Sequence, residues 1–338
     1  MIQTGIRVEP FLVVALLVVA TGCNPALAED VSGAQPYRQS RDDAWWTGPI
    51  LAAGASTLPK GHALVEPYVY NIRSRGRYDA DGHRHTGAPA QTYGSLTYLL
   101  YGLVDDITVG VIPRFTYNDV SSSPDSSGAR LGDFTLQGAY RLSTFREGSF
   151  VPTMSFVVQE TLPTGKYDRL GERPSDGVGN GAYTTTLALY SQYFFWMPNG
   201  RILRTRLNFS YALPDTVSVR DTSVYGTSEG FRGQARPGRA FVAGAAWEYS
   251  VTRNWVLALD AVYENDTSTR VTGTTLLPGG VQAPLSRSSG SSDSITLAPA
   301  IEYNWNSRMG VIAGALFTAS GRNTGATFAP VVAVNMVF

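Results

Sequence analysis

Nine charged side chains of both signs are the residues of this sequence with the clearest capacity for chemistry. They are Glu66, Arg114, Arg141, Arg204, Arg206, Glu248, Asp260, Glu264 and Glu302. Carboxylates and guanidinium groups that meet inside a protein can pair and brace its wall, or they can line a polar path. In the second case the arginines would tune selectivity for anionic or aromatic acids. Both interpretations require these side chains to point inward from the elements that carry them.

Histidine usage argues against another common kind of site, a nucleophilic serine with a histidine base. The histidines are His62, His83 and His85, and the last two lie in the polar loop 81–85, away from any serine expected on a strand. Together with Asp79 and Asp81 they could bind a divalent ion, although two histidines in a polar loop are usually just solvated. We therefore expect no catalytic, cofactor-binding or metal-ligating residue.

Charge and composition narrow the class of protein. Lys plus Arg and Asp plus Glu both number 27, so no net field favours nucleic acid, and we expect no nucleic-acid partner. The 35 glycines, 18 tyrosines and 14 phenylalanines favour strands and turns over a helix bundle. Cys23 is the one cysteine, which leaves the rest of the chain without a disulfide or a cysteine metal cluster.

Stretches of about ten residues that alternate apolar with polar or small side chains recur along the chain. The clearest are residues 107–117, 203–213, 255–264 and 295–305. In residues 203–213, for example, Leu207 and Phe209 share one face of a strand while Arg204 and Arg206 share the other. One face suits lipid and the other water, which is the pattern of a membrane β-barrel strand.

The connections between these stretches alternate in length. Short turns are expected at 105–106, 198–200, 252–254 and 306–308, and long polar loops at about 74–90, 119–132, 165–181, 215–237 and 266–292. The pattern predicts an all-β fold, a transmembrane antiparallel barrel of about twelve strands with both chain ends on the periplasmic side. A soluble β-sandwich is the alternative fold.

Aromatic residues fall at the expected ends of the strands. Trp196, Trp255, Trp305 and Phe338 lie near the short turns, and Tyr117, Tyr211 and Tyr263 lie near the long loops. Two interfacial girdles explain this placement.

The N-terminal region has the features of an export signal. An apolar block at residues 11–20 precedes Ala26-Leu27-Ala28, so residues 1–28 are expected to be a signal peptide cleaved after Ala28. The alternative is a lipobox at residues 20–23, with acylation of Cys23. Residues 29–62 lack alternation and form either a plug or a periplasmic tail, and residues 63–338 form the barrel.

Several short motifs resemble those of a known family. The final strand, residues 328–338, ends on Phe338 and resembles the signal read by the barrel-insertion machinery. Residues 58–62 (LPKGH), 66–68 (EPY), 132–134 (GDF), 139–142 (AYRL) and 162–165 (LPTG) resemble the phenol-degradation meta-pathway family of outer-membrane proteins, a likeness covering most of residues 55–338. These motifs mark strands and turns rather than a substrate site.

The resemblance implies uptake of small, often hydrophobic or aromatic, compounds. We therefore expect an outer-membrane transporter or channel of a Gram-negative bacterium, whose partners are its small-molecule solute, the outer-membrane lipid and lipopolysaccharide, and the insertion machinery. A structural or adhesive barrel without transport is the alternative function, followed by a barrel enzyme that acts on lipids.

Overall fold

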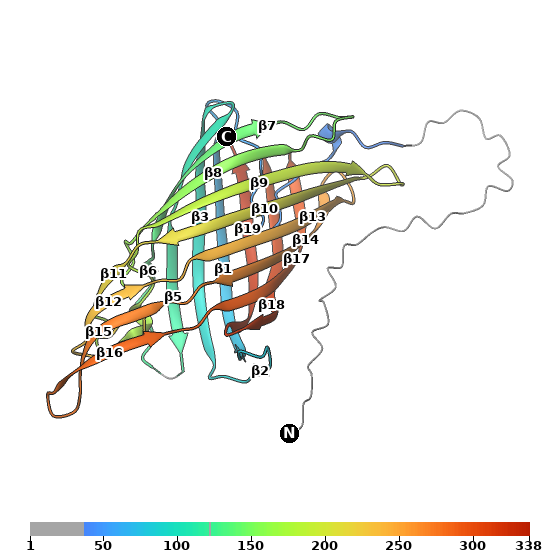
Figure 1. The fold of residues 1–338 in the computed structure, drawn as a ribbon. Helices are drawn as coiled ribbons and strands as arrows, with labels where there is room; N and C mark the ends of the chain where they lie inside the picture. The colour runs from blue at the N-terminus through green and yellow to red at the C-terminus, as the bar shows by residue number, and fades with distance from the viewer. Residues whose placement is uncertain (1–36, 122) are drawn as a thin grey trace, which may run out of the picture. The chain divides into compact units, whose positions relative to one another are not determined.

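The protein is all-β, as its alternating pattern predicts. The computed structural model describes residues 37–121 and 123–338 (Figure 1). The expected signal peptide, Cys23 and residues 29–36 lie outside the described residues. The wall strands are β1 (Ala63–Tyr78), β3 (Ala90–Val104), β4 (Ile107–Ile112), β5 (Arg114–Val120), β7 (Phe134–Ser143), β8 (Thr153–Leu162), β9 (Thr184–Trp196), β10 (Ile202–Pro214), β13 (Ala240–Ser250), β14 (Trp255–Asp266), β17 (Ser292–Asn306), β18 (Met309–Arg322) and β19 (Gly325–Val337).

These strands close into an antiparallel barrel. Each wall strand pairs with its neighbours, and β1 pairs with β19 as well as with β3, which leaves no free edge. Strands β4 and β5 both pair with β3 and are two parts of one wall strand, interrupted at Pro113, which has no backbone N–H to donate. Counted this way, the described residues form a twelve-stranded barrel, and the predicted strand number is confirmed.

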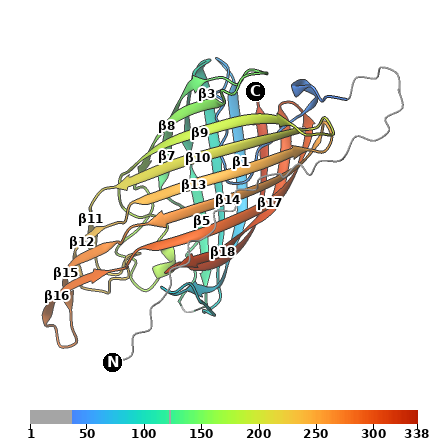
Figure 2. The same cartoon turned by 45° about the vertical axis from the view of Figure 1, so that its right-hand side comes forward.

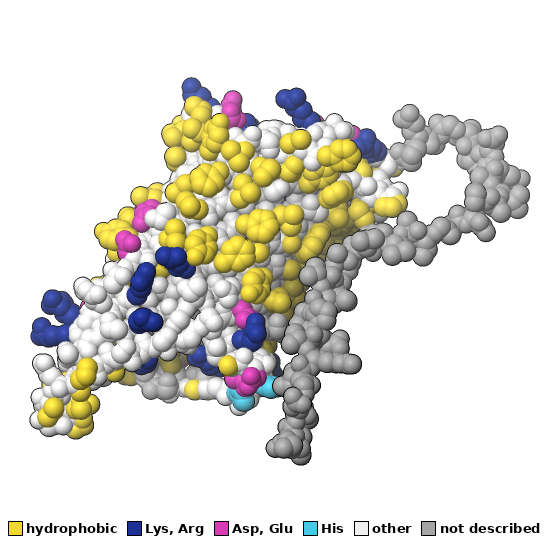
Figure 3. All heavy atoms as spheres, in the orientation of Figure 1, with side chains coloured by type: hydrophobic (Ala, Val, Ile, Leu, Met, Phe, Trp, Pro, Cys, Tyr) yellow, Lys and Arg dark blue, Asp and Glu magenta, His cyan; other side chains and the backbone are white. Residues whose placement is uncertain are grey.

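The two faces of the wall differ as the alternation predicts. On β14, Leu257 and Leu259 are 51% and 41% exposed, whereas Val256 and Asp260 on the opposite face are fully buried. Apolar side chains cover the outside of the wall as a broad belt (Figure 3). Among the described residues, no helix combines the length and hydrophobicity needed to cross a bilayer.

The short and long connections separate to opposite ends of the barrel, as Figures 1 and 2 show. The four predicted short turns lie at the end where the C-terminus lies. Rings of Trp255, Tyr303 and Trp305 pack at steep angles there, with centroids 4.7 Å apart for the first pair and 5.6 Å for the second. The opposite end carries the long loops and one tight turn at Asn323, whose φ of 53° is left-handed.

Two of the long loops are joined by an ion pair. The guanidinium of Arg130, in β6 (Arg130–Leu131), donates to both carboxylate oxygens of Asp176, at 2.8 Å each. Asp176 ends the short 3-10 turn η2 (Pro174–Asp176), and these hydrogen bonds lower its pKa to about 2. The remaining short elements are η1 (Arg41–Asp43) and β2 (Arg84–His85).

Two of the loops expected to be polar and irregular form a second sheet instead, which we call the loop sheet. Strands β11 (Val217–Arg220), β12 (Arg232–Arg236), β15 (Arg270–Leu276) and β16 (Gln282–Ser288) pair in that order beyond the wall. One face packs on a core of Ala182, Val217, Val219, Phe231, Ala235 and Val271. Alternation runs here for only four to seven residues in a background rich in Ser, Thr and Gly, so it is too short to stand out in the sequence.

Replacing Phe231, which is fully buried in this core, should loosen the loop sheet without opening the barrel. Phe231→Ala is expected to cost about 3–5 kcal/mol locally, the usual penalty for truncating a buried Phe. Limited proteolysis with mass spectrometry should then show faster cleavage between residues 217 and 288. The barrel should stay folded, so its electrophoretic mobility should still shift when the sample is heated. Val281→Ala, at an exposed site in the same sheet's hairpin, is the control. Equal cleavage of both variants would contradict the core assignment.

Candidate functional site

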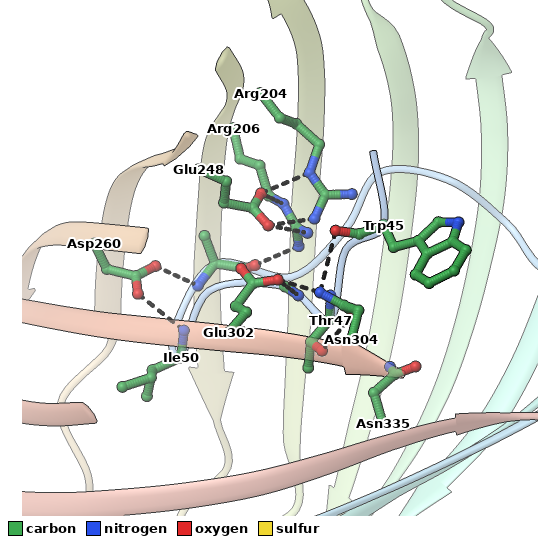
Figure 4. A network of polar contacts seen from close by, with 12 residues as sticks. Trp45, Thr47, Ile50, Arg204, Arg206, Glu248, Asp260, Glu302, Asn304 and Asn335 are labelled. Carbon is green, nitrogen blue, oxygen red and sulfur yellow. Dashed lines mark hydrogen bonds and ion pairs between the residues drawn. The ribbon is translucent and has the colours of Figure 1, made fainter. Parts of the chain in front are cut away.

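Two arginines and a glutamate form the centre of a polar network on the inner wall (Figure 4). Arg204 and Arg206 are two residues apart on β10 and so share its inner face, and Glu248 on β13 is the register partner of Arg204. The Nε atoms of Arg204 and Arg206 donate to Oε2 of Glu248 at 2.7 and 2.9 Å. All three side chains are buried, so the two ion pairs that share Glu248 lie away from bulk water.

A segment of the N-terminal region, residues 44–58, lies against this network, and we call it the inner segment. Its backbone N–H groups donate to two wall carboxylates. Thr47 and Gly48 donate to Glu302 Oε2 at 2.7 and 3.2 Å. The N–H groups of residues 50, 51 and 52 donate to the carboxylate of Asp260 at 3.0, 3.3 and 2.9 Å.

The carbonyl groups of the inner segment are also bonded to the wall. Arg206 Nη1 donates to the carbonyl of Ala52 at 2.8 Å, Asn208 Nδ2 to that of Ala53 at 3.0 Å, and Ser155 Oγ to that of Ala55 at 2.5 Å. A segment without sheet pairing thus has its polar backbone satisfied by wall side chains rather than by a partner strand.

The two ends of the inner segment are fixed as well. At one end the Trp46 ring lies 4.5 Å from the Arg204 guanidinium carbon and packs with Phe194. At the other end, Thr57 Oγ1 donates to the carbonyl of Asp105, and the Leu58 N–H donates to Thr108 Oγ1. The segment therefore contacts wall strands on several sides of the barrel.

A cavity of about 190 Å³ lies between the inner segment and the wall. Apolar and aromatic side chains line most of it, among them Ile50, Leu64, Tyr68, Tyr98, Leu100 and Tyr190. The rings of Tyr68 and Tyr98 meet edge to face with centroids 5.9 Å apart. Polar side chains that also line it include Arg206, Glu66 and Asn335, and Asn335 donates to Glu66 at 3.3 Å.

The nine charged residues singled out in the sequence divide into two groups. Five of them, Arg204, Arg206, Glu248, Asp260 and Glu302, come together around the inner segment, and Glu66 lines the cavity beside it. The other three lie elsewhere. Arg114 and Glu264 are exposed on β5 and β14, and Arg141 pairs with Asp106 at a short turn, 2.5 Å apart.

Sequence reasoning missed the partners that complete this site. The backbone of the inner segment takes part in most of its hydrogen bonds, one of them with Ser155, and backbone groups leave no mark in residue type. Tyr98 could be placed beside Glu66 only by knowing the register of β1 against β3, in which the two are opposite.

The histidines contact other groups. Nδ1 of His62 lies 3.4 Å from the Lys60 carbonyl, and the His85 ring bonds Asp79 at 2.7 Å. Asp79, Asp81 and His83 lie close enough to hold an ion. Asp79 also accepts hydrogen bonds from the N–H groups of Asp81 and His83. The hydrogen bond from the His85 ring and the one from the His83 N–H lower the pKa of Asp79 to about 2. The carboxylate thus closes a solvated turn.

Removing the negative partner of the two arginines should be costly. Glu248→Gln removes the negative carboxylate that lies between two buried guanidinium groups. It is expected to lower the free energy of unfolding by about 3–5 kcal/mol. Urea unfolding in lipid vesicles, followed by tryptophan fluorescence, measures this loss. Glu264→Gln, at an exposed position of the adjacent strand, should change it by less than about 0.5 kcal/mol. Similar losses in both variants would contradict the pairing.

A known structure shares this architecture. An outer-membrane channel from Pseudomonas putida F1 superposes with a TM-score of 0.64 at 15% identity, over 86% of this chain and 100% of that chain, so the two have the same fold. The toluene transporter TodX of Pseudomonas putida superposes only loosely, with a TM-score of 0.35 at 14% identity over 87% of this chain and 95% of that chain. The toluene transporter TbuX of Ralstonia pickettii also superposes loosely, with a TM-score of 0.36 at 10% identity over 83% of this chain and 90% of that chain.

No curated protein matches the chain in sequence. Residues 62–329 match the model of the family described as "Putative MetA-pathway of phenol degradation". That match spans most of the chain and includes every wall strand from β1 to β18 and the start of β19. The protein belongs to this family.

Proposed function

We propose that this protein is an outer-membrane channel for small hydrophobic or aromatic compounds, and that its inner segment acts as a plug. The observation that carries the proposal is the inner segment itself, bonded to the inner wall beside a cavity lined by tyrosines and aliphatic side chains. Family membership and the shared fold with an outer-membrane channel support it. Transport of this kind needs no catalytic step and no cofactor.

The cavity has the size and lining that a single aromatic ring requires. Apolar cavities of about 150 Å³ hold benzene, and this one measures about 190 Å³. Tyr68, Tyr98 and Tyr190 offer ring edges and faces to such a solute. Asn335 and Arg206, which also line the cavity, could hydrogen-bond a hydroxyl or carboxylate substituent.

The way the inner segment is held suits a plug that moves. Between Trp46 and Leu58 its backbone is held by hydrogen bonds to wall side chains, which water can replace, and the wall keeps all its own strand pairing when they break. Displacing the segment would leave a lumen lined by Arg204, Arg206, Glu248, Asp260 and Glu302, which is a mixed polar surface.

The cellular context is part of the proposal. Residues 1–28 would direct export and be removed, residues 29–62 would hold the plug, and residues 63–338 would form the barrel in the outer membrane of a Gram-negative bacterium. Strand β19 would present Phe338, which is 65% exposed, to the insertion machinery before it closes on β1. The short-turn end would then face the periplasm and the loop sheet the outside.

Loosening the plug should increase conductance. Asp260→Ala combined with Glu302→Ala removes the acceptors of five backbone N–H groups of the inner segment. In planar bilayers the double variant is expected to open more often, or in larger steps, than the parent protein. Glu172→Gln, which removes an exposed loop carboxylate, should leave conductance unchanged. A double variant that conducts like its parent would refute the plug.

Filling the cavity should slow uptake of aromatic solutes. Leu100 and Leu99 are adjacent on β3 and face opposite sides of the wall, since Leu100 lines the cavity and Leu99 is 38% exposed on the outside. Leu100→Trp is expected to reduce the entry of phenol or toluene into proteoliposomes several-fold, while Leu99→Trp should not. Equal rates would place the solute path elsewhere, and no uptake by any form would overturn the channel assignment.

A further inference from the structure

The outer face of the loop sheet is positively charged. Arg220 lies opposite Arg232 across β11 and β12, and Arg236 lies opposite Arg270 across β12 and β15. All four side chains are exposed, on the face away from the buried core. None of the four strands of this sheet, all within the described residues, contains an Asp or Glu. Like charges directly opposite one another destabilise a sheet, so this pattern carries a cost that an anion would remove.

Three arginines of this region meet in one groove. Arg236, Arg239 and Arg270 line it with Tyr211, Pro237, Thr267, Ser268 and Ser288, around a volume of about 460 Å³. Across residues 37–121 and 123–338, none of the three guanidinium groups has a carboxylate within ion-pair distance. The groove therefore offers guanidinium and hydroxyl donors, the groups that bind phosphate oxygens.

The groove opens on the outside of the barrel rather than into the lumen. Tyr211 belongs to the apolar outer face of β10 and is 38% exposed, and β10 ends three residues later at Pro214. In Figure 3, dark blue side chains gather over β12 and β15 directly beyond the yellow apolar belt. The charged groove thus begins where the apolar surface ends.

We propose that Arg236, Arg239 and Arg270 form a binding site for the phosphate groups of lipopolysaccharide. In the orientation given under the proposed function, on which this inference rests, the groove lies level with the headgroups of the outer leaflet. Lipid A presents phosphates at that level and acyl chains below it, which matches guanidinium groups above an apolar belt. A free phosphate solute on its way through the channel would instead meet the lumen.

Binding of lipid A to the purified, folded protein in detergent tests the site. Native mass spectrometry or calorimetry should show that bisphosphorylated lipid A binds at least about tenfold more weakly to the triple variant Arg236→Gln, Arg239→Gln, Arg270→Gln than to the parent protein. The triple variant Arg84→Gln, Arg146→Gln, Arg308→Gln removes three exposed arginines elsewhere and should bind like the parent. Heat-shifted electrophoretic mobility confirms that each variant is folded.

Several outcomes would overturn the proposal. Equal binding by the two triple variants would mean that these arginines do not form the site. Equal binding of lipid A from which the phosphates have been removed would mean that the contact is only apolar. Complete displacement of lipid A by millimolar inorganic phosphate would identify free phosphate as the ligand. Bilayer conductance of the same variants is measured separately, so a failed lipid site and a failed channel give different results.

Discussion

The structure depends on one constraint: within lipid, every backbone N–H and C=O group must find its partner inside the protein. Closure of β1 on β19 meets this constraint for the wall, because it removes both sheet edges at once. Closure also creates an enclosed interior. The polar residues that face away from lipid then have to satisfy one another, and this is why buried charges gather on the inner wall rather than at the surface.

The inner segment extends the same requirement to a stretch of chain that has no strand partner. Asp260 and Glu302 accept its N–H groups, while Arg206 and Asn208 donate to its carbonyls. Glu248 holds Arg206 in place for this role, since it bonds both arginines of β10. Wall charges that brace the barrel and wall charges that hold the segment are therefore parts of one network. The interpretation that the arginines line a polar path and tune selectivity stays a prediction.

Sequence patterns predicted the wall strands well, but they predicted the loop sheet and the contacts between charged side chains poorly, for physical reasons. The alternation around Arg204 and Arg206, or around Asp260, reflects lipid on one side and polar groups on the other over ten or more residues. The strands of the loop sheet have water on one face and only a small core on the other, so a few valines such as Val217 and Val219 are their whole signal. Which charges meet depends on register across neighbouring strands, as for Arg204 and Glu248, and alternation within one strand does not encode it.

Recognition of the inner segment through its backbone has an evolutionary consequence. Because Asp260 binds N–H groups that every residue except proline possesses, the anchoring places little demand on side-chain identity at residues 50, 51 and 52. Side chains of this stretch, such as Ile50 and Leu51, nevertheless line the cavity. Substitutions in this short stretch could therefore reshape the cavity while the barrel stayed the same. Related proteins could then diversify in the solutes that they admit without altering a single wall strand.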